Sequence, residues 1–536
     1  RPQNVAVHQP LVLNISPVYL TGGISENGGT KRLVNDSQYS NLIYEYFLVR
    51  FHSRYYKYGD TLPSIDILCR EFNVSAQTVK VSLRRLRTEG YISMHNGMTT
   101  TVIFRQTRQE AADYILNYFS ERWDTYFDLY ASSELIFIPL LVEGLKRLDE
   151  EDLDVLSRLE ERAEADDLIH FYCRVLQKME NPLALNLFWE TTLFQGFPFA
   201  RMEPHPIHFD TALVRQRLKN LRSLLSEGNW ELIRNTLLEY QRSDVRVIMQ
   251  NLEPILRSRP RPPQIPFVWR VYRSRPQICY HLASRILNDI YMGEYREMQF
   301  LPSYEKMAQL YGASVSTLRR TIRILNQAGV CRTLNGKGTR IFPLGTPCEP
   351  PDFESPAIRR NLSFFVQSFE ILIYSCDGVT RSFLSSLSQD RIEELTGLLE
   401  ECLNTRQGEL SIWYYLIFVS QYSHLTGVRE IYKTIYSLFL WGYPLKASSG
   451  NLTDLDCVIM HFTEAMVRHL KEHDYDQCAA DVKELLFKQF PAARQYLIGH
   501  GIPPEELRIS PSIRLFITDT EALECRPENR GSSPES

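Results

Sequence analysis

A long internal repeat is the feature that most constrains how this chain folds. The tripeptide Leu-Pro-Ser at 62–64 recurs at 301–303, an offset of 239 residues. Farther along, Gly-Phe-Pro at 196–198 recurs as Gly-Tyr-Pro at 442–444, an offset of 246 residues. Solenoid proteins repeat every 20–50 residues or so. The much longer period here indicates that a whole two-part unit of about 230 residues was duplicated, so we expect the same fold twice.

The first part of each unit predicts three helices followed by a β-hairpin, the elements of a winged helix-turn-helix. In the first copy, Ser64 and Ser75 are suited to cap helices, Gly90 to end the last helix, and Asn96-Gly97 is a strong hairpin signal. Within residues 37–105 the expected helices are Gln38–Phe51, Ser64–Phe72 and Ala76–Glu89, and the expected strands are Tyr91–His95 and Thr100–Phe104.

Residues 276–343 repeat this design. Ser303 and Ser314 are the expected caps, and Gly329 ends the last helix. The turn of the second hairpin is Asn335-Gly336-Lys337-Gly338. We expect a first helix over Ile278–Met292, further helices from Ser303 and Ser314, and strands over Val330–Leu334 and Thr339–Phe342.

The third helix of each copy has an apolar face and a basic face. In the first copy the apolar stripe is Val79, Leu83 and Leu86, and Lys80, Arg84 and Arg87 lie opposite. The chain as a whole is slightly acidic, with a formal net charge of −4, but both helix-turn-helix segments contain more basic than acidic residues. Since a helix fits the major groove and basic side chains contact phosphates and base edges, double-stranded DNA is the predicted partner.

At these residues the chain resembles the GntR family of DNA-binding regulators. The stretches are LPSIDILCREFNVSAQTVKVSLRRLRTEGYI and LPSYEKMAQLYGASVSTLRRTIRILNQAGVC. The resemblance implies a dimeric, ligand-responsive repressor or activator that reads a short palindrome. The predicted DNA-binding residues combine the contacts that the resemblance implies with the basic helix faces and the hairpin turns. They are Ser64, Ser75, Gln77, Thr78, Lys80, Arg84, Asn96, Gly97, Ser303, Ser314, Ser316, Thr317, Arg319, Arg320, Asn335, Gly336 and Lys337.

Two pairs of positions depart from the family pattern. The family usually has Arg directly after the serine that begins the recognition helix, where this chain has Ala76 and Val315. Asp66 and Glu305 stand where a further Arg is common, whereas the basic residue near the helix middle is kept as Lys80 and Arg319. The lost arginines leave the operator and the affinity open, but they do not remove the module.

The second part of each unit is predicted to be all-helical, with about six helices, so the fold class is mainly α. The stretches FYCRVLQKMENPLALNLFW and LLSEGNWELIRNTLLEY resemble the helical effector domain of FadR-type GntR regulators, which implies a small-molecule effector. The expected divisions are a flexible segment 1–36, winged helix-turn-helix 37–105, helical domain 106–255, linker 256–275, winged helix-turn-helix 276–343, helical domain 344–508 and tail 509–536.

The related helical domains often bind a metal through an Asp and three His, but this chain does not repeat that pattern. Asp166 and His170 are four residues apart, and Tyr172 stands at the family's His position. We therefore expect no metal and no cofactor, and we expect His205, His208, His461 and His469 to be ordinary histidines. The aromatic residues around 189–199, 413–415 and 441–443 are interpreted as core. Arg158, Arg162 and Arg174 are either exposed helix charges, which we favour, or anchors for an acidic effector.

The stretch between the two units is rich in proline and arginine. Five prolines between 260 and 276 exclude a helix there, and six arginines between 257 and 275 make the stretch cationic. A semi-rigid spacer is the favoured interpretation, to which non-specific phosphate contact can be added.

The resemblance implies a bacterial-type protein, and the remaining features of the sequence indicate a cytoplasmic protein without enzymatic activity. Ten scattered cysteines form no CxxC pair, no apolar stretch reaches the length of a membrane span, and no signal pattern is present. The chain has no GxxxxGK, GxSxG or HExxH motif, and its helical halves lack the strand-helix alternation of a pyridoxal-phosphate enzyme. Three hypotheses remain: a DNA-binding regulator working as a monomeric pseudo-dimer or a homodimer, a scaffold with degenerate winged helices, and, least favoured, an enzyme.

Overall fold

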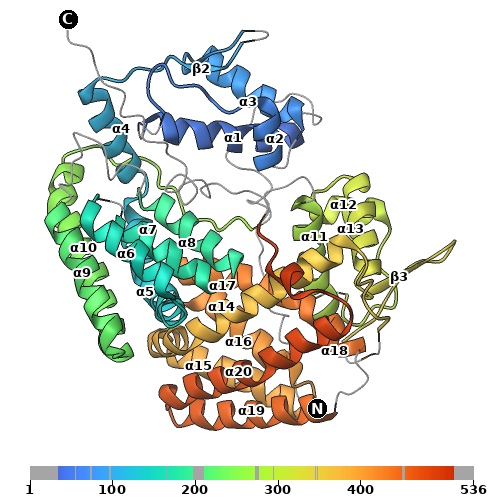
Figure 1. Cartoon of the computed structure of the whole chain (residues 1–536). Coiled ribbons are helices and arrows are strands. Elements are labelled where there is room, and N and C mark those ends of the chain that lie inside the picture. Colours follow the sequence, from blue (N-terminus) through green and yellow to red (C-terminus); the bar gives the residue numbers. More distant parts are fainter. Residues whose placement is uncertain are drawn as a thin grey trace, which may run out of the picture.

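The computed structural model describes residues 34–511 except 53, 55, 73–74, 96–97, 166, 197–209, 272–276, 294, 345, 347 and 449–452. Within these residues the chain is mainly helical and contains two small sheets of two strands each (Figure 1). The predicted fold class is therefore confirmed. Most of the predicted flexible segment 1–36, and the tail from 512 onward, lie outside the described residues.

The first winged helix-turn-helix has its own small core. Phe47, Phe51, Leu68, Val79 and Leu83 are each at most 1% exposed and belong to a cluster separate from the rest of the protein. The strands are shorter than predicted, and the outer edge of the second strand pairs with the loop at residues 59–62. The elements are α1 (Val34–His52), α2 (Ile65–Phe72), α3 (Ala76–Thr88), β1 (Ile92–Ser93) and β2 (Thr101–Val102).

The second winged helix-turn-helix repeats these elements with a longer hairpin. Four residue pairs, from Cys331–Ile341 to Leu334–Gly338, make its antiparallel ladder. Its buried residues belong to the same continuous core as the helical parts. The elements are α11 (Gln277–Tyr291), α12 (Tyr304–Tyr311), α13 (Val315–Gln327), β3 (Cys331–Leu334) and β4 (Gly338–Ile341), within about two residues of the predicted ends.

Each helix-turn-helix is followed by a helical part, which we call the first helical part (108–257) and the second helical part (356–508) (Figure 1). The buried aromatic residues Trp413, Tyr415 and Trp441 confirm their predicted place in the core, whereas Phe197 and Phe199 lie outside the described residues. Seven α-helices are described in each part, against about six expected: α4 (Arg108–Ser120), α5 (Trp123–Leu145), α6 (Glu150–Arg162), α7 (Asp167–Lys178), α8 (Pro182–Phe194), α9 (Thr211–Glu227), α10 (Trp230–Arg257), α14 (Pro356–Ser386), α15 (Gln389–Thr405), α16 (Glu409–Tyr422), α17 (Thr426–Phe439), α18 (Tyr443–Ser448), α19 (Thr453–Lys471) and α20 (Tyr475–Gly499).

The two helical parts are joined by a pair of equivalent contacts. On α5, the Asp128 carboxylate accepts hydrogen bonds from the backbone amides of Thr426 and Gly427, both at 2.7 Å, and from the Thr426 hydroxyl at 2.6 Å. On α14, the Gln367 side-chain oxygen accepts from the amide of Leu183 at 2.8 Å. Asp128 and Gln367 are 239 residues apart, which is the repeat offset, so they occupy equivalent positions in the two parts. Each accepts hydrogen bonds from the N-terminus of a helix in the other part, in the reciprocal way that is typical of two-fold-related subunits.

The helices α5 and α17 approach each other closely at Gly427. A Cβ atom at this position would lie 2.5 Å from the Ser132 hydroxyl oxygen of α5. That hydroxyl accepts a hydrogen bond from the amide of Val428 at 3.1 Å. Glycine is therefore required here, because any side chain would force the two helices apart.

The proline- and arginine-rich linker is packed onto the protein rather than free. As predicted, its described residues 258–271 contain no helix. Phe267 and Trp269 are buried, and Arg259 forms an ion pair with Asp113 of α4 at 2.8 Å. Arg261 pairs with Asp124 of α5. Two of the arginines that could have contacted phosphates are thus already bound to carboxylates.

Candidate nucleic-acid interface

The first recognition helix, α3, is oriented by its cap and its apolar stripe. The Ser75 hydroxyl accepts a hydrogen bond from the amide of Thr78 at 3.3 Å, which fixes the start of the helix. Val79, Leu83 and Leu86 are at most 1% exposed. The opposite face of α3 is therefore turned to solvent.

Predicted DNA contacts on α3 are placed unequally by the structure. Gln77, Arg84 and Arg87 are exposed, and Lys80 is half-buried. Thr78 is only 2% exposed, and its hydroxyl lies 2.9 Å from that of Ser75, so this side chain belongs to the cap. The exposed basic residues remain available to phosphates and base edges.

A fourth basic residue of α3, Arg85, serves the packing of the domain. Its guanidinium lies 3.6 Å from the centre of the Tyr44 ring of α1 and donates to Glu89 at 2.9 Å. The Tyr44 hydroxyl donates to the same carboxylate, and these contacts hold the pKa of Glu89 below its ordinary value. Arg85 thus links α1 to α3, a role that the sequence alone did not indicate.

The second recognition helix, α13, also presents a basic face. The Ser314 hydroxyl accepts from the amide of Thr317 at 3.1 Å and caps the helix. Arg319, Arg320 and Arg323 are all exposed. The apolar stripe is buried, as predicted; it consists of Leu318, Ile322 and Leu325.

The second helix of each motif starts at a serine whose hydroxyl is at the surface. Ser64 accepts from the amide of Ile67 at 3.3 Å, and Ser303 accepts from the amide of Lys306 at 3.3 Å. Both serines are exposed. Exposed helix N-termini of this kind suit phosphate oxygens.

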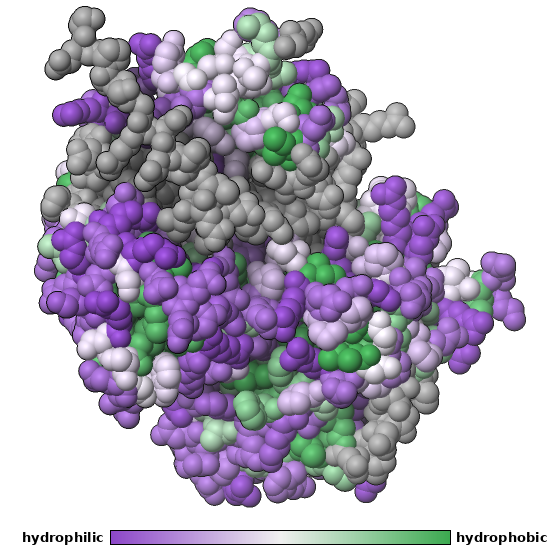
Figure 2. Space-filling view, viewed as in Figure 1, coloured by the Kyte–Doolittle hydropathy of each residue, from purple (hydrophilic) through white to green (hydrophobic). Residues whose placement is uncertain are grey.

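The second hairpin projects from the body and ends in a hydrophilic tip (Figure 2). Asn335, Gly336 and Lys337 are exposed at this tip, and Gly336 has a φ of 74°, which the tight turn requires. The corresponding residues of the first hairpin, Asn96 and Gly97, lie outside the described residues.

The two modules are attached to the helical parts in different ways. In the second module, the Trp441 indole donates to the Ser284 hydroxyl at 3.1 Å, and the Tyr436 hydroxyl donates to Asn288 at 2.9 Å. These buried bonds fix α11 against the second helical part. The first module instead stacks one histidine ring on α4: the ring of His52 lies 3.8 Å from that of Tyr114, with the two planes 3° apart.

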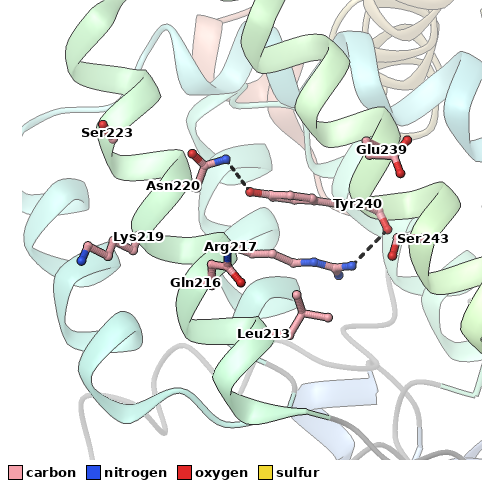
Figure 3. A pocket seen from close by; sticks show the side chains of 9 residues that line it. All are labelled: Leu213, Gln216, Arg217, Lys219, Asn220, Ser223, Glu239, Tyr240 and Ser243. Carbon is pink, nitrogen blue, oxygen red and sulfur yellow. Dashed lines mark hydrogen bonds between the residues drawn. The ribbon is translucent and has the colours of Figure 1, made fainter.

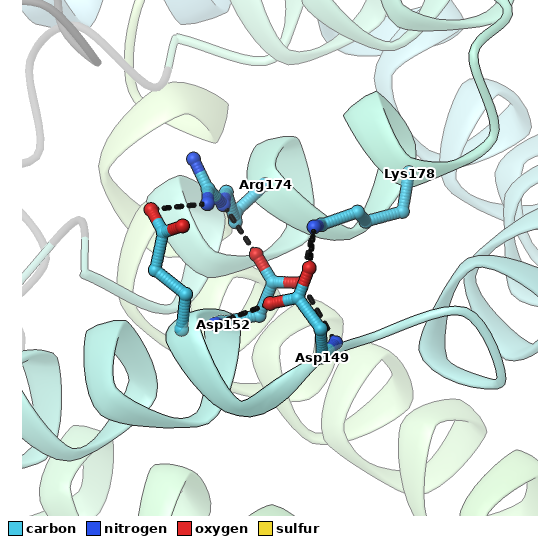
Figure 4. A network of polar contacts seen from close by, with 5 residues as sticks. Asp149, Asp152, Arg174 and Lys178 are labelled. Carbon is cyan, nitrogen blue, oxygen red and sulfur yellow. Dashed lines mark hydrogen bonds and ion pairs between the residues drawn. The ribbon is translucent and has the colours of Figure 1, made fainter.

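The arginines considered as effector anchors pair with buried aspartates instead. Arg174 of α7 donates to Asp152 at 2.6 Å, and Lys178 contacts the same carboxylate at 2.7 Å; Asp152 is fully buried (Figure 4). Arg162 pairs with Asp167, which is also fully buried. Both arginines therefore neutralise charges inside the first helical part, while Arg158 is exposed.

Those candidate metal-ligating residues that the structure describes do not come together. Among the described residues, no group of three or more His, Cys, Asp or Glu side chains is placed to hold a metal ion. His461 is exposed, and His469 lies 2.6 Å from Asp481. Asp166, His205 and His208 lie outside the described residues.

One described helix, α5, is long and apolar enough to cross a membrane when judged by length and composition alone. Half of its most apolar window is buried inside the protein, where α5 packs against α10, α14 and α17. A buried core helix meets the same criterion.

Comparison with known families supports both modules. The family of bacterial regulatory proteins named gntR matches residues 40–102 and 280–341. These ranges are the two segments in which the sequence predicts a winged helix-turn-helix. The comparison with curated proteins found no match.

Solved structures of GntR-type regulators resemble parts of the chain. A Streptococcus agalactiae GntR is 16% identical, covers 40% of this chain and 99% of its own, and has a TM-score of 0.20. Escherichia coli McbR/YncC is 18% identical over 40% of this chain and 97% of its own, with a TM-score of 0.21. Lar, described as controlling the expression of the Listeria monocytogenes agr system and mediating virulence, is 15% identical. The match covers 42% of this chain and 99% of Lar, with a TM-score of 0.19. Because these scores are low, the assignment rests on the two family matches.

Proposed function

Because this chain is a tandem member of the GntR family, with two of its DNA-binding domains, we propose that it is a sequence-specific transcriptional regulator in which one polypeptide reads two unlike half-sites. The observation that carries this proposal is the exposure of a basic recognition face on both α3 and α13. The two faces differ in their side chains, so the two bound sequences are expected to differ as well.

The joined helical parts support a monomeric pseudo-dimer. An ordinary dimeric regulator needs two chains to present two recognition helices. Here the reciprocal contacts of Asp128 and Gln367 pair the two helical parts within one chain. We propose that the seven divisions expected from the sequence hold, and that the chain acts without a second copy. Sedimentation at decreasing protein concentration tests this, since an obligate dimer in dilute solution would refute it.

The outward residues of the two recognition helices are proposed to divide the work of recognition. Lys80, Arg84 and Gln77 would contact one half-site, and Arg319, Arg320 and Ser316 the other. The serines Ser64, Ser75, Ser303 and Ser314 and the turns around Asn96 and Lys337 would contact the sugar-phosphate backbone. The family usually has an arginine directly after the serine that caps the recognition helix, but this chain has Ala76 and Val315 there. We therefore expect residues in the next turn of each recognition helix to contact the bases.

Selection of bound sequences from a random duplex pool tests the proposal. The wild type is expected to enrich two unlike half-sites. Lys80→Ala and Arg319→Ala should each weaken binding roughly 5- to 150-fold and relax preference in one half-site only. Lys488→Ala, an exposed lysine on α20, is the matched control and should bind as the wild type does.

A scaffold with degenerate winged helices is the second candidate, favoured by the absence of arginine at Ala76 and Val315. It predicts binding with a steep dependence on salt and no enriched sequence. Enrichment that disappears in the two alanine variants would exclude it. We further propose that a small-molecule effector bound in a helical part modulates DNA binding, that the protein catalyses no reaction, and that it acts in the bacterial cytoplasm.

A further inference from the structure

A cavity of about 560 Å³, lined mainly by residues with polar groups, opens between α9 and α10 in the first helical part (Figure 3). Arg217 of α9 and Tyr240 of α10 reach across it in opposite directions, and the Asn220 amide donates to the Tyr240 hydroxyl at 2.8 Å. The remaining lining residues are Leu213, Gln216, Lys219, Ser223, Glu239 and Ser243. Side chains that can donate hydrogen bonds thus outnumber apolar ones around this cavity.

Arg217 is buried but only partly bound. Its side chain is 7% exposed and donates to Asp244 at 2.7 Å, with a longer contact of 3.5 Å to the Tyr240 carbonyl. Its Nε has no hydrogen-bond partner. That Nε is enclosed by protein, whereas the guanidinium as a whole lines the cavity and would lie beside an oxygen-bearing ligand there.

The acidic groups near the cavity are already engaged. Glu239 contacts Arg246 at 2.5 Å, and Asp244 is bound by Arg217. Lys219, by contrast, forms no ion pair among the described residues. Lys219 is exposed, and Figure 3 shows its side chain directed away from Arg217 and Tyr240.

The duplicated half lacks this arrangement. Asn229 and Asp474 are the N-caps of α10 and α20, and they provide a common reference in the two halves. Arg217 stands twelve positions before its cap, where the second half has Phe462; Tyr240 stands eleven positions after its cap, where the second half has Leu485. Phe462 and Leu485 are each 6% exposed and belong to the continuous apolar core. Where the first half has Arg217 and Tyr240 beside a cavity, the second half therefore has two apolar core residues.

From these contacts we infer that the α9–α10 cavity binds a small anion with a carboxylate or phosphate group, which accepts hydrogen bonds from Arg217 and the neighbouring amide and hydroxyl groups. Arginine suits such groups because its planar donors match their oxygens. The inference rests on the proposed function, in which this anion is the effector. It places ligand binding in the first helical part only.

The helix α10 connects the cavity to both DNA-binding modules. Its C-terminal residues Ile248, Leu252 and Leu256 pack with α4, against which the first module stacks through His52. The linker that leaves α10 is tied to α4 and α5 and leads to the second module. A ligand that draws α9 and α10 together would therefore move the supports of both recognition helices.

Calorimetric titration of the full chain without DNA tests the inference, with inorganic phosphate, glycerol 3-phosphate and citrate as probes and glycerol as the neutral control. We expect at least one anion to bind and glycerol not to bind. Arg217→Met should weaken the binding roughly 10-fold or more. Ser243→Leu, which narrows the cavity and keeps the buried arginine, should also weaken the binding. Arg222→Met removes an α9 arginine outside the cavity and should bind as the wild type does.

The inference is overturned if no probe binds, or if Arg217→Met and Ser243→Leu bind as tightly as the wild type. The comparison of phosphate with citrate tells which anionic group is recognised. A protein that enriches a DNA sequence and binds no anion refutes this inference alone. A protein that binds the anion through Arg217 and enriches no DNA sequence refutes the proposed function alone.

Discussion

Removal of the Asp128 carboxylate tests whether the two helical parts stabilise each other. Asp128 accepts three hydrogen bonds at 2.6–2.7 Å from Thr426 and Gly427, at the start of α17. Loss of a helix cap costs about 0.5–2 kcal/mol, and a hydrogen bond to a charged group contributes about 1.5–3 kcal/mol. Since Asp128 is half-exposed, we expect Asp128→Ala to lower the free energy of unfolding by about 2–3 kcal/mol, and Asp128→Asn by about 1 kcal/mol.

Urea unfolding followed by far-ultraviolet circular dichroism measures this change. Asp154→Ala, an exposed acidic residue of α6, is the matched control and should alter stability by less than about 0.5 kcal/mol. A double-mutant cycle with Thr426→Val should give a coupling energy of about 1 kcal/mol. The reasoning fails if Asp128→Ala is no more destabilising than the control, or if the two changes are additive.

Three further outcomes are expected in the same unfolding assay. Gly427→Ala should cost about 1–3 kcal/mol because its Cβ would lie 2.5 Å from the Ser132 hydroxyl, and Ser132→Gly should recover part of the loss. Burial lowers the pKa of His52 to about 4. The unfolded chain therefore takes up the proton first, and stability should fall between pH 6.5 and 4, by about 2 kcal/mol at pH 5. His52→Phe should remove that dependence, and a wild type equally stable at pH 5 and 8 would contradict it. Arg174→Met should cost about 3 kcal/mol because it leaves the buried Asp152 carboxylate undercompensated; Asp152→Asn in that background should restore some stability, and no loss would show the pair to be dispensable.

Local chemistry made the DNA-binding modules predictable. Ser75, Ser303 and Ser314 cap the helices that the sequence assigned to them, and the spacing of Val79 and Leu83 identified the buried face of α3. Such features depend on residues a few positions apart, which a single sequence displays directly. The strands of the first hairpin are shorter than predicted, and their outer edge pairs with a loop about 40 residues earlier in the chain, a contact that strand periodicity does not report.

Features that depend on distant partners were not predictable. The sequence suggested that the linker arginines Arg259 and Arg261 are free cations. Each instead donates a hydrogen bond to an aspartate more than 100 residues earlier in the chain. Arg174 read as an exposed helix charge, although its partner Asp152 is fully buried. The repeat offset did contain a signal for the reciprocal contacts, since Asp128 and Gln367 are equivalent polar positions on apolar helices. Only the fold shows that each reaches into the other half.

The reciprocal capping within one chain changes how such a pairing can evolve and how it responds to dilution. Two halves on one polypeptide meet at an effective concentration that is set by the connecting chain, so their pairing does not depend on the protein concentration. They are also always made in equal amounts. A substitution in one half is never imposed on the other, as it would be in a homodimer. The polar wall at Arg217 and the apolar packing at Phe462 are the outcome of that freedom, with each half specialised while the contact between them was retained.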